Sequence, residues 1–468
     1  MRNFAHHKIK NIMLRKILLF TYISLTSLIA YSQSITVYSQ SIDEKLVNAI
    51  NSTDWFALDS IHSSVPKDSI HPYIEVYSRC LIGYKLNRPD ISIPAFNELF
   101  DTQSEYLGLN SMLSSAFMFG RDLSKVGENE FAASMINQVL DETQEYLDSA
   151  IVANFAMQVN WYKGLAAYKP YQIQFNGDGD GTVPFTIVPM GPKEKGGVLM
   201  QLGESKINGM PADIIFDTGC ASSIISPEMA EKYGLIPLEG TNVSVTGVSE
   251  TQGYLAIAKE LQIGNITLRD IPFTVAPLSS VNDEADQYSG VINILLGNDL
   301  MLHLKEVTMD FIANKLTISS KAPFIPVKTD AKPNMCFSES SLLLCKCNIL
   351  KNPLLMLIDS GDNSYGVVGE SFFENNKQYV VDNGIKDTVK QAGIGGIKIN
   401  ERYILPNVEI SMGGHTVDMP EIDVRTTQEI GSGSECEGVI GLRTLMLYSS
   451  VRFNFVDFVL TTGKPRKD

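Results

Sequence analysis

The spacing of hydrophobic positions divides the chain into a helical part and a β-rich part. Between about residues 41 and 168, apolar residues recur three or four positions apart, as in the run 131–139, which predicts amphipathic helices. Pro94 suits the first turn of one of them. We expect six or seven short helices in antiparallel pairs. They would form a helical-repeat-like domain over 34–168, without the regular period of a tetratricopeptide solenoid.

Near Lys169 the pattern changes to an alternation of apolar and polar residues, which is the period of a β-strand. Residues 171–175 and 182–188 are predicted strands on either side of a turn at 176–181, so we expect a β-hairpin within a linker over 169–195. The turn resembles the start of a calcium-binding loop. Its twelfth position holds isoleucine rather than glutamate, so the calcium motif is incomplete.

The β-rich part of the chain repeats a set of landmarks at a near-constant offset. One apolar strand ends in Asp217-Thr218-Gly219, and another ends in Asp359-Ser360-Gly361, 142 positions later. Each motif is followed by a β-branched pair, and then by two large apolar residues and a glycine. These glycines are Gly297 and Gly441, 144 positions apart. Several landmarks at one offset indicate two similar β lobes rather than two unrelated β domains.

The two turns place aspartates where general acid–base chemistry needs them. A buried strand brings each aspartate to the edge of a core, the next hydroxyl can bond to the backbone of a matching loop, and glycine permits the tight turn. If two such lobes face each other, carboxylates about 3 Å apart cannot both ionise and must share a proton. One can then take a proton from water while the other protonates a peptide carbonyl.

This pattern resembles the aspartic peptidase superfamily, in its pepsin-like and retropepsin-like branches, and the short lobes are most similar to exported bacterial two-lobed retropepsin-like proteins. The resemblance implies a multidomain protein, in which an N-terminal all-α domain precedes two all-β lobes at 196–325 and 326–468, related by a pseudo-two-fold axis. It also implies that Asp217 and Asp359 are the catalytic pair of an aspartic endopeptidase. The residues that it implies as supports of the active loops are Thr218, Gly219, Gly297, Ser360, Gly361 and Gly441.

Family members close a β-hairpin flap over substrate, and the candidate segments here are 243–254 and 393–403. The flap candidates within them are Gly247, Tyr254, Gly395 and Tyr403. Tyr254 fits an ordinary strand tyrosine equally well. Two positions depart from the family pattern, namely Cys220 after Asp-Thr-Gly and Asp362 after Asp-Ser-Gly. Asp362 could raise the pKa of the pair or point to solvent, and solvent is the favoured interpretation. The pH optimum therefore stays open.

Composition and charge exclude several function classes. A net charge of −15 argues against a nucleic-acid partner, which needs a basic surface. The chain has no serine-nucleophile elbow, zinc-peptidase motif or CxxC pair, so we expect neither a metal nor another cofactor. Its six cysteines are too few for a disulfide scaffold, and we expect buried thiols or a single disulfide. Cys345 and Cys347 share a strand face and are poorly placed to bridge each other.

The N-terminus has the pattern of a secretory signal peptide. Basic residues precede an apolar run over 17–30, which is too short to span a bilayer comfortably. Small residues suit cleavage after Ser32, and Met13 gives a more compact charged start than Met1. We therefore assign 1–33 to a signal peptide and expect an exported protein, in the periplasm, outside the cell or at its surface. An uncleaved membrane anchor is the alternative.

Two other functions fit parts of the pattern. A catalytically inactive peptide- or protein-binding module would keep the cleft and use the helical domain to dock a partner, although loss of an aspartate would favour it and both are present. Glycoside hydrolysis also uses two carboxylates but does not need twinned Asp-Thr/Ser-Gly turns. An endopeptidase acting on peptide or protein substrates is favoured, and the role of the helical domain is left open.

Overall fold

The structure is a computed structural model. It describes residues 38–190, 197–246, 250–278, 292–321, 332–393, 396–426 and 436–466. The predicted signal peptide and the flap glycines Gly247 and Gly395 lie outside the described residues. No helix in the described part of the chain is both long and apolar enough to cross a membrane.

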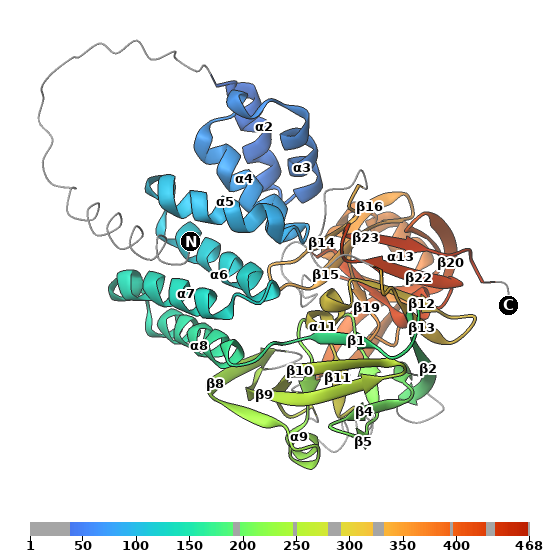
Figure 1. Ribbon diagram of the computed structural model, residues 1–468. Helices are drawn as coiled ribbons and strands as arrows, with labels where there is room; N and C mark the ends of the chain where they lie inside the picture. Colours follow the sequence, from blue (N-terminus) through green and yellow to red (C-terminus); the bar gives the residue numbers. More distant parts are fainter. Residues whose placement is uncertain are drawn as a thin grey trace, which may run out of the picture. The chain divides into compact units, whose positions relative to one another are not determined.

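The N-terminal region is helical, as the sequence pattern predicts (Figure 1). Seven α-helices precede the first strand of the described chain: α2 (Gln40–Asn51), α3 (Trp55–Ser64), α4 (Pro72–Lys85), α5 (Pro89–Thr102), α6 (Leu109–Lys125), α7 (Asn129–Thr143) and α8 (Ser149–Ala166). The side chains of Asp54 and Asp148 cap α3 and α8 by accepting a backbone N–H three residues on. The expectation for Pro94 is wrong, because Pro89 begins α5 and Pro94 lies inside it.

The chain divides into two compact units, and the division does not fall at residue 168. One unit runs up to Tyr84 and includes Asp90–Phe119, whereas the other contains Lys85–Pro89 and the chain from Gly120 onward. The helices α7 and α8 thus belong to the unit that contains the β-strands.

The last helix explains why the division falls earlier than expected. Leu165 of α8 is buried in a cluster with Leu238, Leu255 and Ile257 of the first β half. Gly164 lets the backbone of α8 approach closely, since a Cβ there would lie 3.0 Å from Leu238 Cδ1. The apolar face of α8 is therefore covered by the sheet as well as by the preceding helices.

The first β half contributes most of a 15-stranded sheet. Its elements are β1 (Gln172–Phe175), β2 (Gly181–Met190), β3 (Gly197–Leu202), β4 (Ser205–Ile207), β5 (Met210–Pro211), β6 (Ile214–Phe216), β7 (Ile224–Ile225), α9 (Pro227–Lys232), β8 (Ile236–Thr246), β9 (Glu250–Ile263), β10 (Ile266–Val275), β11 (Ile294–Leu296), α11 (Asn298–Leu304), β12 (Glu306–Asp310) and β13 (Lys315–Ile318). The strand order is β23-β22-β12-β13-β2-β3-β6-β11-β7-β10-β9-β4-β5, with β1 on β10 and β8 on β9.

The hairpin expected within 169–195 is wrong, although both of its strands are present. β1 pairs antiparallel with β10, with Gln172 opposite Arg269. β2 pairs instead with β3 and β13. Alternation predicts a strand but not its partner. Here β1 pairs with residues more than ninety positions away, and β2 pairs with the strand that follows it, β3, and with the distant strand β13.

The second β half forms an eight-stranded sheet and supplies two strands to the first. Its elements are β14 (Met335–Phe337), β15 (Leu343–Ile349), β16 (Asn352–Asp359), β17 (Gly366–Val368), α12 (Glu370–Asn375), α13 (Lys377–Asn383), β18 (Ile385–Gly393), β19 (Gly396–Met412), β20 (His415–Arg425), β21 (Gly438–Gly441), α14 (Leu442–Leu445), β22 (Ser450–Asn454) and β23 (Val459–Thr462). The sheet order is β14-β15-β16-β21-β17-β20-β19-β18.

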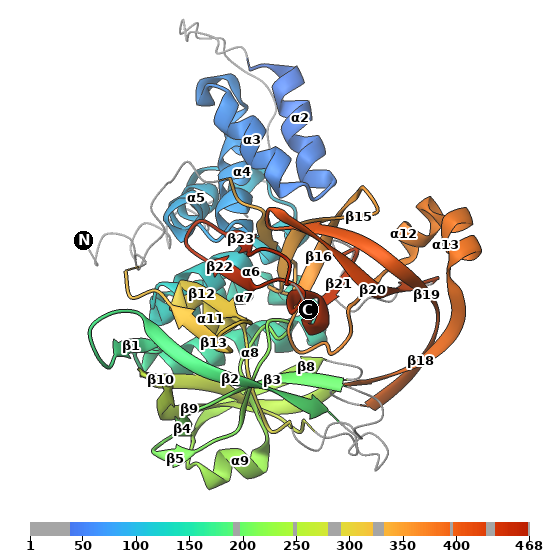
Figure 2. The ribbon, with the colours of Figure 1, turned by 90° about the vertical axis from the view of Figure 1, so that its right-hand side faces the viewer.

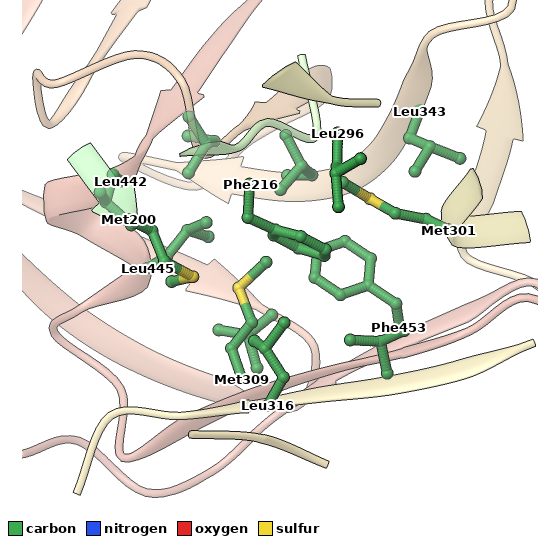
Figure 3. Close-up of a cluster of buried hydrophobic side chains, with 14 of the residues drawn as sticks. Met200, Phe216, Leu296, Met301, Met309, Leu316, Leu343, Leu442, Leu445 and Phe453 are labelled. Carbon is green, nitrogen blue, oxygen red and sulfur yellow. The ribbon is translucent and has the colours of Figure 1, made fainter. Parts of the chain in front are cut away.

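Both halves pair four strands in the same way. β6 runs parallel to β11, which is antiparallel to β7, and β7 is parallel to β10. β16, β21, β17 and β20 repeat these relations in the second half. The halves also share β-structure, because β22 pairs with β12 (Figure 2). One buried cluster includes Phe216 and Leu296 of the first half and Leu445 and Phe453 of the second (Figure 3).

Candidate active site

Each of the two Asp-Thr/Ser-Gly turns follows buried strand residues. Asp217 follows β6, whose three residues are all buried, and Asp359 ends β16 after the buried Ile358. Each strand lies beside a parallel partner, with Phe216 opposite Leu296 and Asp359 opposite Gly441. Since neither strand can slide without exposing a core residue, the aspartates are fixed at the ends of the strands.

The hydroxyls of Thr218 and Ser360 link the two turns reciprocally. Thr218 Oγ1 donates to Ile358 O at 2.7 Å and accepts from Ser360 N at 2.9 Å. Ser360 Oγ donates to Phe216 O at 2.8 Å and accepts from Thr218 N at 3.0 Å. Both side chains are fully buried. The four bonds therefore join turns that are 142 residues apart, in a place that solvent does not reach.

The two carboxyl groups meet across this link. A Cβ built on Gly361 would lie 2.6 Å from the carboxyl carbon and from both oxygens of Asp217. A Cβ on Gly219 would collide in the same way with the carboxyl of Asp359. Each carboxyl thus lies over the glycine of the opposite turn. A side chain on that glycine would displace the carboxyl. The structure brings together the two aspartates that the sequence singles out.

Backbone amides hold one oxygen of each carboxyl. Gly219 N donates to Asp217 Oδ1 at 2.9 Å, and Gly361 N donates to Asp359 Oδ1 at 2.8 Å. Asp362 N adds a second bond to Asp359 Oδ1 at 3.0 Å. These donors orient the carboxyls so that both face the other turn.

Burial makes ionisation of the pair unfavourable. Desolvation raises the pKa of Asp217, and it raises the pKa of Asp359 well above its usual range. The negative charges of Asp217 and Asp362 raise the pKa of Asp359 further. Two desolvated carboxyls in contact favour a state in which they hold one proton between them.

Gly297 and Gly441 lie behind the two loops. A Cβ on Gly297 would lie 2.6 Å from the backbone carbon and oxygen of Ser222, and a Cβ on Gly441 would collide with the carbonyl of Ser364. The residue after each glycine donates its backbone N–H to the loop, from Asn298 to Cys220 O and from Leu442 to Asp362 O, both at 2.8 Å. Both glycines therefore permit a close backbone contact that supports the turns.

A hydrogen-bond network around the half-buried Asp299 supports the first loop and was missed in the sequence. Asp299 Oδ1 accepts from Ser223 N, Ser223 Oγ and Leu300 N, each at 2.8 Å, and its Oδ2 accepts from Tyr171 Oη at 3.0 Å. The Tyr171 ring stacks on His303 with centroids 4.0 Å apart. Asp299 comes two positions after Gly297, which is a signal that could have marked it. Nothing local in the sequence indicates Tyr171.

The two segments expected as flaps lie in the hairpins β8–β9 and β18–β19. Tyr254 lies on β9 opposite Val275, and Tyr403 lies on β19, where its ring stacks on Phe373 with centroids 5.7 Å apart. Both tyrosines pack against the core. Within the described residues, the contacts of the two aspartates include neither tyrosine.

Other chemistry near the loops is limited. The described residues contain no group of three or more His, Cys, Asp or Glu side chains arranged to hold a metal ion. The six cysteines are thiols, and Cys345 and Cys347 lie on one buried face of β15. Burial, together with the nearby charge of Asp217, raises the pKa of the Cys220 thiol well above its usual value. A reactive thiolate is therefore disfavoured at that position.

Comparison with known families agrees with the geometry of the first half. Residues 204–300 match the family model described as aspartyl protease, a segment that runs from β4 into α11 and contains both Asp217 and Gly297. The match supports the aspartyl protease superfamily and, with it, a hydrolase that binds peptides. None of the curated proteins matches the chain.

Proposed function

We propose that the protein is an aspartic endopeptidase in which Asp217 and Asp359 activate a water molecule. The observation that carries this proposal is that the carboxyl of each aspartate lies over the glycine of the opposite turn. The ionised carboxyl takes a proton from the water, whose oxygen attacks the peptide carbonyl carbon. The protonated carboxyl gives its proton to the carbonyl oxygen. Return of a proton to the nitrogen then breaks the carbon–nitrogen bond of the tetrahedral intermediate.

The proposal includes two lobes, at 196–325 and 326–468, related by a pseudo-two-fold axis. The shared pairing of four strands supports it, as do the reciprocal hydroxyl bonds and the matching positions of Gly297 and Gly441. The hairpins β8–β9 and β18–β19 are the proposed flaps. A catalytically inactive binding module would keep the same geometry, so activity has to be measured.

The test is cleavage of a peptide library by the processed protein between about pH 3 and 8, with and without a transition-state-mimicking inhibitor of aspartic peptidases. Asp217→Asn and Asp359→Asn should each reduce kcat by at least roughly 10²-fold, because each removes one partner of the acid–base pair. The double variant should be little worse than either single one, since the pair acts as a unit.

The exposed Asp418 of β20 offers a matched control. Asp418→Asn removes the same charge outside the loops and should cleave like the wild type. Undiminished cleavage by Asp217→Asn or Asp359→Asn would rule out the mechanism. Absence of cleavage in the wild type, with peptide binding retained, would favour the binding module.

We also propose that the protein is exported after removal of its first residues. The basic start and short apolar run before Ser32 support this. N-terminal sequencing of protein from its native host should give a start near Gln33. Intact Met1 or Met13 in a cytoplasmic fraction would contradict export.

A further inference from the structure

The loop that carries Asp217 is held from behind by the segment that begins at Leu296. Asp217 N donates to Leu296 O at 3.0 Å. Asn298 bonds to the loop twice, with its backbone N–H to Cys220 O at 2.8 Å and with Nδ2 to Thr218 O at 2.9 Å. The position of this segment therefore determines how the turn presents its aspartate.

Asp299 fixes the next part of the same contact through Ser223. Its Oδ1 accepts from both the backbone N–H and the hydroxyl of Ser223, each at 2.8 Å. Because the hydroxyl proton is given to Asp299, Ser223 Oγ accepts from Gly297 N, at 3.2 Å. Ser223 is fully buried. The orientation of one carboxylate thus sets the bonds of the loop and of the glycine that supports it.

The second loop is held differently at the equivalent position. Arg443 comes two positions after Gly441, as Asp299 comes two positions after Gly297. Arg443 Nε donates directly to Asn363 O at 2.8 Å. A carboxylate offers only acceptors, so Asp299 requires donors for both of its oxygens. The loop and α11 supply donors to Oδ1, and the donor to Oδ2 comes from outside both.

Tyr171 supplies this donor from the residue just before β1. Its Oη donates to Asp299 Oδ2 at 3.0 Å, and its ring stacks on His303 with centroids 4.0 Å apart. His303 lies four positions after Asp299 on α11, so both contacts come from one face of that helix. The φ angle of Tyr171 is 60°, in the left-handed region that residues with side chains rarely adopt. Such a conformation persists where the surroundings fix it, and here the hydroxyl bond and the ring stack do so.

The groups around Asp299 keep its carboxylate ionised without a paired charge. Desolvation raises the pKa of Asp299, whereas the bonds from Ser223 and Tyr171 lower it. Desolvation, together with the positive charges of Lys125 and Lys305, lowers the pKa of His303 to about 4, so its ring is neutral near pH 7. The hydroxyl of Tyr171 therefore stabilises the form of Asp299 that accepts all of these bonds.

We propose that Tyr171 is a positioning residue of the first active loop, holding Asp299 in the orientation that fixes Ser223 and the loop to which it belongs. Tyr171 precedes residues 204–300, which match the aspartyl protease family, and it lies in the segment that the sequence pattern assigns to a linker. This segment would thus be part of the proposed catalytic machinery rather than a connection. The inference rests on the proposed endopeptidase function and adds to it a residue from outside the matched segment.

The test is Tyr171→Phe, which removes the hydroxyl and keeps the ring that stacks on His303. With Oδ2 unpaired, the carboxylate of Asp299 can rotate or take up a proton, and the loop loses its fixed orientation. The variant should lower kcat about tenfold and change KM less than about twofold, because the orientation of the loop affects the reacting group rather than substrate binding.

The matched control is Tyr233→Phe. The hydroxyl of Tyr233 donates to Pro211 O, also at 3.0 Å, and it lies in the same half of the molecule without bonding to the loop or to Asp299. This variant should cleave like the wild type at a temperature at which thermal unfolding shows all three proteins to be folded. Equal kcat in Tyr171→Phe and the wild type, equal losses in the two variants, or a change confined to KM would overturn the inference and leave the endopeptidase proposal standing.

Amide hydrogen exchange followed by mass spectrometry separates this inference from the proposed function, since it needs no cleavage. Peptides covering 218–226 and 294–301 should exchange faster in Tyr171→Phe than in the wild type, and at the wild-type rate in Tyr233→Phe. Faster exchange in Tyr171→Phe without cleavage by the wild type would support the positioning role and refute the endopeptidase proposal. Unchanged exchange in Tyr171→Phe would overturn the positioning role, whether or not the wild type cleaves peptides.

Discussion

Replacing Thr218 with valine tests the link between the two loops without changing its volume. The hydroxyl that is lost donates to Ile358 O and accepts from Ser360 N, and both turns are buried at this point. Valine has nearly the same shape as threonine but offers neither a donor nor an acceptor. Two backbone groups would therefore lose their partners where water cannot replace them.

The size of the effect follows from these two bonds. An unsatisfied buried backbone group costs about 1–3 kcal/mol, so Thr218→Val should lower the free energy of unfolding by about 2–6 kcal/mol. Thr218→Ser is the matched control, because it keeps the hydroxyl and removes one methyl group, at about 1 kcal/mol. The stability order should be wild type, then Thr218→Ser, then Thr218→Val.

Urea unfolding followed by circular dichroism measures this order, and amide hydrogen exchange shows where it arises. In Thr218→Val, the N–H of Ser360 should exchange faster than in Thr218→Ser. Ser360→Ala should resemble Thr218→Val, and the double variant should cost less than the sum, since both side chains serve one link. If Thr218→Val were as stable as Thr218→Ser, the reciprocal bonds would not hold the loops together.

Three further outcomes are expected. Burial raises the pKa of Asp359, so the protonated Asp359 contributes fully to stability below the usual carboxyl pKa, and this contribution is lost as pH rises through the raised value. The Tm of Asp359→Asn should therefore fall less than the Tm of the wild type between about pH 4 and 8. Parallel curves of Tm against pH would contradict this. Gly297→Ala must displace the backbone of Ser222 and should lower the Tm in thermal unfolding, whereas Gly108→Ala, with open space around it, should not. Leu165→Ala should destabilise the β-containing unit by about 2–5 kcal/mol in urea unfolding; an unchanged midpoint would exclude the packing of α8 on the sheet.

The sequence predicts the loops well because their requirements are local. A buried strand, an aspartate, a hydroxyl and a glycine occupy consecutive positions, and the offset between Asp217 and Asp359 indicates that they form a pair. The supporting glycines follow from the same offset. Their position behind the loops is a backbone contact that only glycine permits, so residue type alone carries the signal.

What could not be predicted depends on partners that are remote in sequence. The alternation in residues 171–175 predicts β1 correctly, but its pairing with β10 is set by a sheet edge nearly a hundred residues away. The apolar stripe of α8 is the same whether it packs on a helix or a sheet, so periodicity could not place the boundary between the units. Tyr171 reaches Asp299 through the fold alone.

The shared sheet has a consequence for the synthesis of the protein. β2 and β13, which flank the first aspartate in the chain, belong to a sheet that is completed by β22 and β23, and β23 ends at Thr462. A ribosome adding about 5–20 residues per second needs roughly 10–50 s to travel from Asp217 to that strand. For roughly the first 7–30 s of this interval, until Ile358 and Ser360 have been added, the first loop lacks the hydroxyl and carbonyl partners that these residues supply. The nascent chain therefore cannot hold the proposed catalytic pair during that time, and the shared sheet that supports it is completed only near the end of synthesis.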